Sequence, residues 1–145
     1  MTQRTVEVIV KVATEVFDWG INFLKDKRRD KENDSTTDSD YKILIVSYGT
    51  MSRVCKTAID EMKEEGLEIG LLRPKTLFPF PEKEVFSAAS KESCQAVISI
   101  EMSMGQMVED VERCVKGQRE VHFYGECGGE IPSPEKIIEV VKGLL

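Results

Sequence analysis

The sequence predicts an α/β protein, a three-layer α/β/α sandwich with a mostly parallel sheet. Two observations carry this prediction. After residue 40, short apolar runs of the kind found in buried strands alternate with segments whose apolar residues recur at helical spacing. Glycine and proline separate these segments. Alternating strands and helices favour a parallel sheet with helices on both faces.

The first 40 residues follow a different pattern. From Val6 to Leu24, apolar residues recur at the spacing of one helix face, which predicts an N-terminal helix over residues 1–24. The β-branched residues between Thr5 and Val12 leave a short strand there as an alternative. Residues 25–40 include no apolar residue and 11 charged ones, a pattern typical of a solvated linker. The helix would therefore pack either on its own body or on another chain.

The α/β body is expected over residues 41–145. A buried strand is predicted from Ile43 to Val46, and a turn rich in hydroxyl groups follows over residues 47–52. Apolar residues from Val54 to Met62 then form the stripe of a helix, which Gly66 ends. This strand, turn and helix make up the first α/β unit.

A second strand is predicted over Leu67–Leu72. The prolines between residues 73 and 81 keep the following chain extended, because proline and the residue before it disfavour helix. Pro81 suits the first position of the next helix, whose stripe includes Val85 and Ala89. The sequence thus predicts a long extended connection here.

The remaining elements repeat the alternation. A third strand is predicted over Ala96–Ile100, a helix over Met104–Val115 and a fourth strand over Glu120–Tyr124. A loop rich in glycine precedes a last helix, which Ser133 opens. The body therefore contains four strands and four helices in regular order.

Composition excludes several classes of function. The 145 residues fit one domain of ordinary size, and the formal net charge of -6 argues against general nucleic-acid or acidic-membrane binding. No apolar run approaches the roughly 18 residues that a membrane-spanning helix needs. The N-terminus shows no secretory signal pattern. A cytoplasmic location is expected.

The cysteines do not form a metal-binding pattern. Cys55, Cys94, Cys114 and Cys127 are widely spaced without a CxxC pair, and His122 is the single histidine of the sequence. We expect the cysteines to behave as small apolar residues and His122 to be a packed or edge residue of its strand. No metal site is predicted in this chain.

Ligands of open α/β sheets tend to bind beyond the carboxyl ends of the strands, and three loops qualify here. The first, Ser47–Ser52, has three hydroxyl groups and Gly49, which suit either a phosphate or carboxylate cradle or a helix cap. It lacks both GxGxxG and the lysine of a P-loop. Its chemistry stays open between a cradle and a cap.

The other two loops offer a carboxyl group and glycines. Glu101 follows the third strand, where it would serve as an acid, a base, a subunit contact, a cap of the next helix, or a partner for Arg73 or Arg53. Methionines on either side of Ser103 suit an adaptable interface. The third loop has three glycines between residues 125 and 129, where backbone can approach a ligand or another chain closely. The sequence shows no nucleophile and no complete catalytic pair. It therefore predicts that the α/β body is a binding or assembly domain.

Four ordered blocks carry a resemblance to a known family: ILIVSYGTMSRVCKTAIDEMKEEGLEIGLLRP, TLFPFP, SIEMSMGQMVEDV and FYGECGGEIPSPEKI. Over residues 41–145 the chain resembles the α subunits of 2-oxoacid:ferredoxin oxidoreductases, in the domain shaped like the transketolase C-terminal domain. The resemblance implies a complex that oxidatively decarboxylates a 2-oxoacid to an acyl-CoA and reduces ferredoxin. It implies thiamine diphosphate, Mg²⁺, iron-sulfur clusters and CoA in the complete complex, and none of them in this chain.

The resemblance also implies the role of this chain. Its partners would be the other subunits of the complex, whose electrons ferredoxin accepts. No nucleic acid or membrane is expected as a partner, and a homodimer is an open alternative. The chain would be a non-catalytic assembly domain that is inactive on its own. It would be either a shortened form of the subunit, the product of a split gene or a free-standing paralogue. The positions to test at the strand ends are Ser47, Gly49, Thr50, Ser52, Arg73, Glu101, Gly105, Gln106, Gly128 and Gly129. The alternative is a free-standing module that binds a nucleotide or another phosphate-bearing molecule at residues 47–52, a loop distantly similar to the phosphate loop of flavodoxins.

Overall fold

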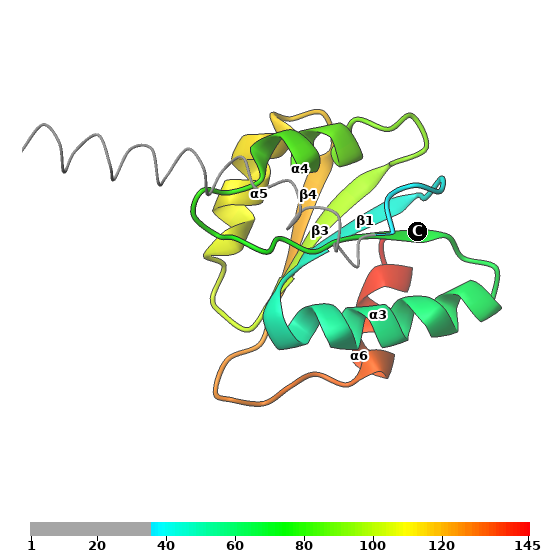
Figure 1. Ribbon diagram of the computed structural model, residues 1–145. Helices are drawn as coiled ribbons and strands as arrows, with labels where there is room; N and C mark the ends of the chain where they lie inside the picture. Colours follow the sequence, from blue (N-terminus) through cyan, green and yellow to red (C-terminus); the bar gives the residue numbers. More distant parts are fainter. Residues whose placement is uncertain (1–35) are drawn as a thin grey trace, which may run out of the picture. The chain divides into compact units, whose positions relative to one another are not determined.

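The computed structural model describes residues 36–145, which contain a single parallel sheet and its covering helices (Figure 1). In chain order the elements are β1 (Ile43–Ser47), α3 (Gly49–Glu64), β2 (Ile69–Leu72), α4 (Glu82–Ala89), β3 (Ala96–Glu101), α5 (Met107–Val115), β4 (Glu120–Gly125) and α6 (Pro134–Lys142). Every strand and helix predicted after residue 40 is confirmed. The helix predicted over residues 1–24 and the linker as far as residue 35 lie outside the described residues.

The sheet has the strand order β2-β1-β3-β4, and every pair is parallel. Ile43 of β1 lies opposite Ile69 of β2 and Ala96 of β3, and Ala96 in turn lies opposite Glu120 of β4. All four strands therefore end at the same edge of the sheet, where the connecting loops gather. The predicted mostly parallel sheet is confirmed.

Helices cover both faces of the sheet, α3 and α6 on one side and α4 and α5 on the other (Figure 1). In the central strand β1, Leu44 and Val46 pack toward α4 and α5, whereas Ile43 and Ile45 pack toward α3 and α6. Successive side chains of a strand point to opposite faces, so a strand covered on both sides is apolar throughout. The predicted three-layer α/β/α sandwich is confirmed.

Several element boundaries differ from the prediction. Helix α3 begins at Gly49, inside the turn predicted over residues 47–52. Strand β2 begins at Ile69 rather than Leu67, because the Leu67 N–H bonds the Met62 carbonyl at 3.0 Å and closes α3 together with Gly66, whose φ is +82°. Helix α5 begins at Met107 rather than Met104, since Gly105 has a φ of +98° and cannot continue a right-handed helix. No helix within residues 36–145 has the length and apolarity to cross a membrane.

Thr36 lies beside the outer edge of β2. This residue forms an antiparallel bridge with Leu71, and its N–H donates to the Leu71 carbonyl at 3.0 Å. The Lys91 ammonium group donates to the carbonyls of Thr37 and Ser39. The outer edge of β2 is therefore partly covered by residues before Tyr41.

Candidate functional site

The candidate site is the edge of the sheet where the strands end. The loop after β4 is tied to the end of β3, because the Glu126 N–H donates to the Glu101 carbonyl at 3.3 Å. Figure 1 shows the loops that follow β3 and β4 at the same end of the sheet. The structure therefore brings the second and third predicted loops together.

The first loop uses its hydroxyl groups inside the fold. The buried Ser47 hydroxyl donates to the Ile100 carbonyl at 2.8 Å, and the Ser52 hydroxyl donates to the Gly49 carbonyl at 2.7 Å. No side chain caps α3, so the helix-cap alternative for this loop is wrong: Ser47 still belongs to β1, and Ser52 already lies within the first turn of the helix. Gly49, with a φ of +61°, permits the turn as expected, and Thr50 is exposed.

The cysteines near this loop and in the core are not poised to react. Cys55, Cys94 and Cys114 are buried, as predicted, whereas Cys127 is exposed in the third loop. Burial raises the pKa of the Cys55 thiol to about 11, although a hydrogen bond with Ser47 opposes the shift. The thiolate is the nucleophilic form, so Cys55 is inert at neutral pH.

Glu101 caps helix α5. The side chain is 1% exposed, and its position at the end of β3 directs both carboxyl oxygens into the following turn. These oxygens accept hydrogen bonds from the hydroxyls of Ser99 and Ser103 at 3.3 and 2.5 Å and from the N–H groups of Gln106, Met107 and Val108 at 3.2, 2.9 and 3.0 Å. The helix-cap alternative is confirmed, and a carboxyl group engaged in this way is not free for acid-base chemistry.

The third loop begins with a pair of residues that the sequence did not single out. The Tyr124 hydroxyl donates to the Glu126 carboxyl group at 2.8 Å. Burial, and then Glu126 through its hydrogen bond and charge, raises the pKa of Tyr124 to about 12. The spacing of two residues at the end of a strand is the signal that would have found this pair. Gly128 and Gly129 follow with φ of +96° and +86°, and both are exposed.

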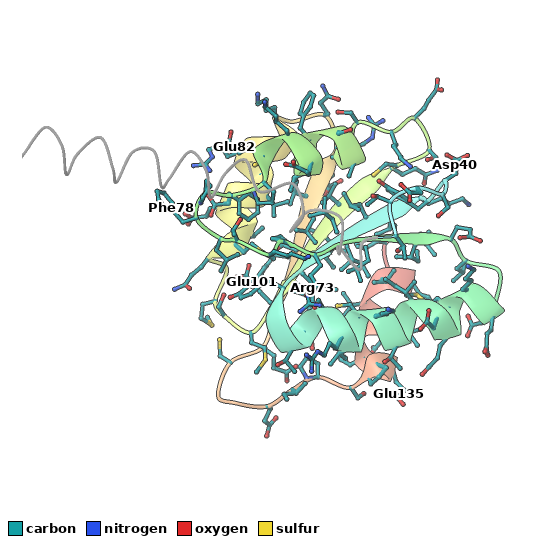
Figure 2. The ribbon with its side chains drawn as sticks, in the orientation of Figure 1. Asp40, Arg73, Phe78, Glu82, Glu101 and Glu135 are labelled. Atoms are coloured by element: carbon teal, nitrogen blue, oxygen red, sulfur yellow. The ribbon has the colours of Figure 1, made fainter. Side chains whose placement is uncertain are left out.

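The remaining candidates lie around these loops. Arg73 is half-buried directly after β2, and Figure 2 labels it together with Glu101. Gln106 is exposed before α5, whereas a methyl group added to Gly105 would lie 3.6 Å from the Phe123 ring. His122 is half-buried in the edge strand β4, as expected of a packed or edge residue.

The buried polar side chains of the described residues are engaged within the fold. Within residues 36–145, no buried side-chain nitrogen or oxygen lacks a hydrogen-bond partner. No group of three His, Cys, Asp or Glu side chains in the same range is arranged to hold a metal ion. The arrangement joins loops to one another, and what it presents outward is chiefly glycine backbone, Thr50, Gln106 and two methionines.

Residues 42–137 match the family model of the pyruvate:ferredoxin oxidoreductase core domain II. The 2-oxoglutarate synthase subunit KorA of Methanothermobacter marburgensis is 37% identical over 83% of this chain and 31% of its own length. The ketoisovalerate oxidoreductase subunit VorB of the same organism is 40% identical over 71% of this chain and 28% of its own length. The chain therefore spans about a third of the length of these relatives.

Two solved structures share the fold. A 2-oxoglutarate:ferredoxin oxidoreductase from Magnetococcus marinus, with 2-oxoglutarate, coenzyme A and succinyl-CoA bound, superposes with a TM-score of 0.60 and 25% identity over 73% of this chain and 18% of that one. A split-gene transketolase, described as an inactive beta4 tetramer, gives a TM-score of 0.60 at 16% identity over 72% of this chain and 38% of that one. The second likeness concerns the fold alone.

Proposed function

The chain belongs to the 2-oxoacid:ferredoxin oxidoreductase family, and from this membership we propose that its α/β body is a non-catalytic assembly domain of such an enzyme. The domain corresponds to the transketolase C-terminal-like part of the α subunit. The other subunits are its partners, and ferredoxin accepts electrons from the complete complex. The complete complex oxidatively decarboxylates a 2-oxoacid and releases an acyl-CoA.

The observation that supports this proposal is that Glu101 is buried and caps α5. It is the one buried carboxyl group among the described residues, and five donors occupy its oxygens while it caps α5. A general acid or base must reach the proton that it transfers. Glu101 therefore holds the loop after β3 against the start of α5, which supports a structural rather than a catalytic role for this residue.

Three polar side chains at the strand ends are engaged within the fold, which supports placing the cofactors elsewhere. Mg²⁺ prefers oxygen ligands such as free carboxylates, and the Glu101 oxygens are engaged within the fold. The Ser47 and Ser52 hydroxyls donate to backbone carbonyls, so neither is directed at a phosphate. We assign thiamine diphosphate, Mg²⁺, the iron-sulfur clusters and CoA to other parts of the complex.

Turnover by the purified chain tests this proposal. The chain is mixed with thiamine diphosphate, Mg²⁺, CoA, a redox dye and, in turn, pyruvate, 2-oxoglutarate and a branched-chain 2-oxoacid. We expect no dye reduction above the rate without protein, whereas a complete 2-oxoacid oxidoreductase in the same mixture serves as the positive control. Dye reduction that depends on the 2-oxoacid and on this chain alone would overturn the assignment.

The alternative of a nucleotide-binding module gains no support from these contacts. Its candidate loop offers the exposed Thr50 and the N-terminus of α3, while its two serine hydroxyls are taken up internally. A helix N-terminus favours anions in general and does not define a nucleotide site. A melting temperature that rises with added nucleotide would be the finding in its favour.

A further inference from the structure

The two edges of the sheet differ in how they are covered. Residues before Tyr41 meet the outer edge of β2 through the bridge between Thr36 and Leu71. Strand β4 pairs with β3 on one side, and its other side has no backbone partner within residues 36–145. An open edge presents unpaired N–H and C=O groups to which another strand can add.

Exposed apolar side chains lie on β4 and on the two loops at its end. They are here called the β4-edge patch and are Met102 (38% exposed), Met104 (86%), Phe123 (44%) and Ile131 (54%). The first two belong to the loop after β3, the third to β4 itself and the last to the loop after β4. These loops are joined through the hydrogen bond between Glu126 and Glu101, so the patch is fixed to one end of the fold.

The Phe123 ring packs against the backbone of two glycines. The Phe123 ring lies so close to Gly125 and Gly105 that a methyl group on Gly125 would collide with it and with the Ser103 carbonyl. Glycine thus leaves the room that the ring occupies. A side chain that is already ordered loses little further entropy on binding, which favours docking.

Acidic side chains lie at both ends of β4. Glu120 at the start of β4 is 79% exposed in its side chain, and Glu126 and Glu130 follow in the adjoining loop. Arg119, which precedes β4, directs its guanidinium group to the backbone carbonyls of Lys91, Cys94 and Gln118. A second copy of this edge would place acidic residues against acidic residues, whereas a basic partner would be complementary.

We propose that the β4 edge binds an extended segment of another subunit, which adds a strand to the sheet and covers the β4-edge patch, and that basic residues on this segment face Glu120 and Glu130. The inference rests on the proposed function, since it takes the partner to be a subunit of the oxidoreductase. Main-chain hydrogen bonds to β4 supply affinity, and the apolar residues with their acidic rim select the partner.

Co-purification from the native cell tests the proposal. Tagged wild-type chain is compared with Met104→Glu and with the double variant Glu120→Lys/Glu130→Lys. Leu145→Glu and Glu64→Lys serve as controls, because both residues are exposed and lie on helices away from this edge or at the C-terminus. We expect the two test variants to recover at least tenfold less of the thiamine diphosphate-binding subunit than the wild type, and the controls to change this recovery less than twofold. The melting temperature of every variant should equal that of the wild type. Hydrogen exchange of residues 120–125 should slow on assembly.

The outcomes separate this inference from the proposed function. If the wild type recovers the subunit but the test variants do so equally well and β4 exchange stays fast, the inference is wrong and the proposed function stands. If the amides of β4 already exchange slowly in the isolated chain, the inference is also overturned. In a monomer the edge would then be covered by the chain itself, and in a dimer by a second copy. If the wild type recovers no oxidoreductase subunit, both fail together.

Discussion

Glu101 connects three segments at the end of β3. Its carboxyl oxygens accept hydrogen bonds from the loop residue Ser103 and from the first N–H groups of α5, and its carbonyl accepts the N–H of Glu126. N–H groups at a helix start have no partner within the helix, so a buried helix end needs such an acceptor. The carboxyl group therefore holds the start of α5, and the backbone carbonyl of Glu101 holds the loop after β4.

Replacing Glu101 with alanine should be costly. The change leaves buried N–H groups of α5 without an acceptor, which we expect to lower the free energy of unfolding by about 2–4 kcal/mol. Urea unfolding measures the loss. Glu109→Ala, on the exposed side of the same helix, is the control and should cost less than about 0.5 kcal/mol. Equal losses for the two variants would contradict the role assigned to Glu101.

Tyr41 makes the stability depend on alkaline pH. Burial, with a smaller contribution from Cys94, raises the pKa of Tyr41 from 10.0 to about 12, and the hydroxyl donates to the Ala88 carbonyl at 3.0 Å. Between these two pKa values the unfolded chain has released a proton that the folded protein keeps. Stability is therefore full below about pH 10 and falls by up to about 2–3 kcal/mol as the pH rises through 12.

The variant Tyr41→Phe isolates this contribution. It should cost about 1 kcal/mol at neutral pH, because the Ala88 carbonyl loses its donor. Its loss of stability between pH 9 and 11.5 should nevertheless be smaller than that of the wild type, although Tyr124 and Cys55 still contribute. Urea midpoints at both pH values provide the comparison. A wild-type loss that the variant reproduces in full would show that Tyr41 does not titrate as described.

At the scale of single elements, β2 depends on close packing against Tyr41. A methyl group added to Gly70 would lie 2.7 Å from the Tyr41 ring. We expect Gly70→Ala to lower the free energy of unfolding by about 1–3 kcal/mol, because a close-packed core has no room for an added methyl group. In Gly143→Ala, the matched control, the nearest atom is 3.4 Å away and φ is −68°, so little change should follow in urea unfolding. A Gly70→Ala variant as stable as the control would mean that the ring moves aside freely.

The elements themselves were predictable, and their ends were not. Apolar runs and helical spacing identified every strand and helix after residue 40, because each is covered on the side that its pattern implies. The starts of β2 and α5 depend on particular hydrogen bonds, from the Leu67 N–H to the Met62 carbonyl and from the Met107 N–H to the Glu101 carboxyl group. The spacing of apolar residues does not reveal such contacts. The predicted start was therefore two residues early for β2 and three residues early for α5.

The site was predictable in position and less so in chemistry. Parallel topology alone places the three loops at one edge of the sheet. Whether Ser47 caps a helix or bonds Ile100 depends on which strand lies beside β1, and the exposure of Phe123 depends on β4 being the edge strand. Strand order is a property of the whole fold, which explains why the serine cap was expected and the exposed ring was not.

At the scale of the whole molecule, the described body satisfies its own polar groups and leaves an apolar patch with an acidic rim outside. Within residues 36–145 every buried side-chain nitrogen and oxygen has a partner, while Met104 is 86% exposed. A surface of this kind is more typical of a protein contact than of a reaction centre. The chain spans about 30% of the relatives that it matches, so the account assigns the chemistry to other parts of the enzyme.

Native mass spectrometry of the complex purified through a tag on this chain tests that assignment most directly. The account predicts one copy of the chain for each thiamine diphosphate-binding subunit, 2-oxoacid-dependent ferredoxin reduction by the complex, and no turnover by the chain once it is released. Recovery of the chain alone or only with itself, or turnover by the released chain, would contradict the account.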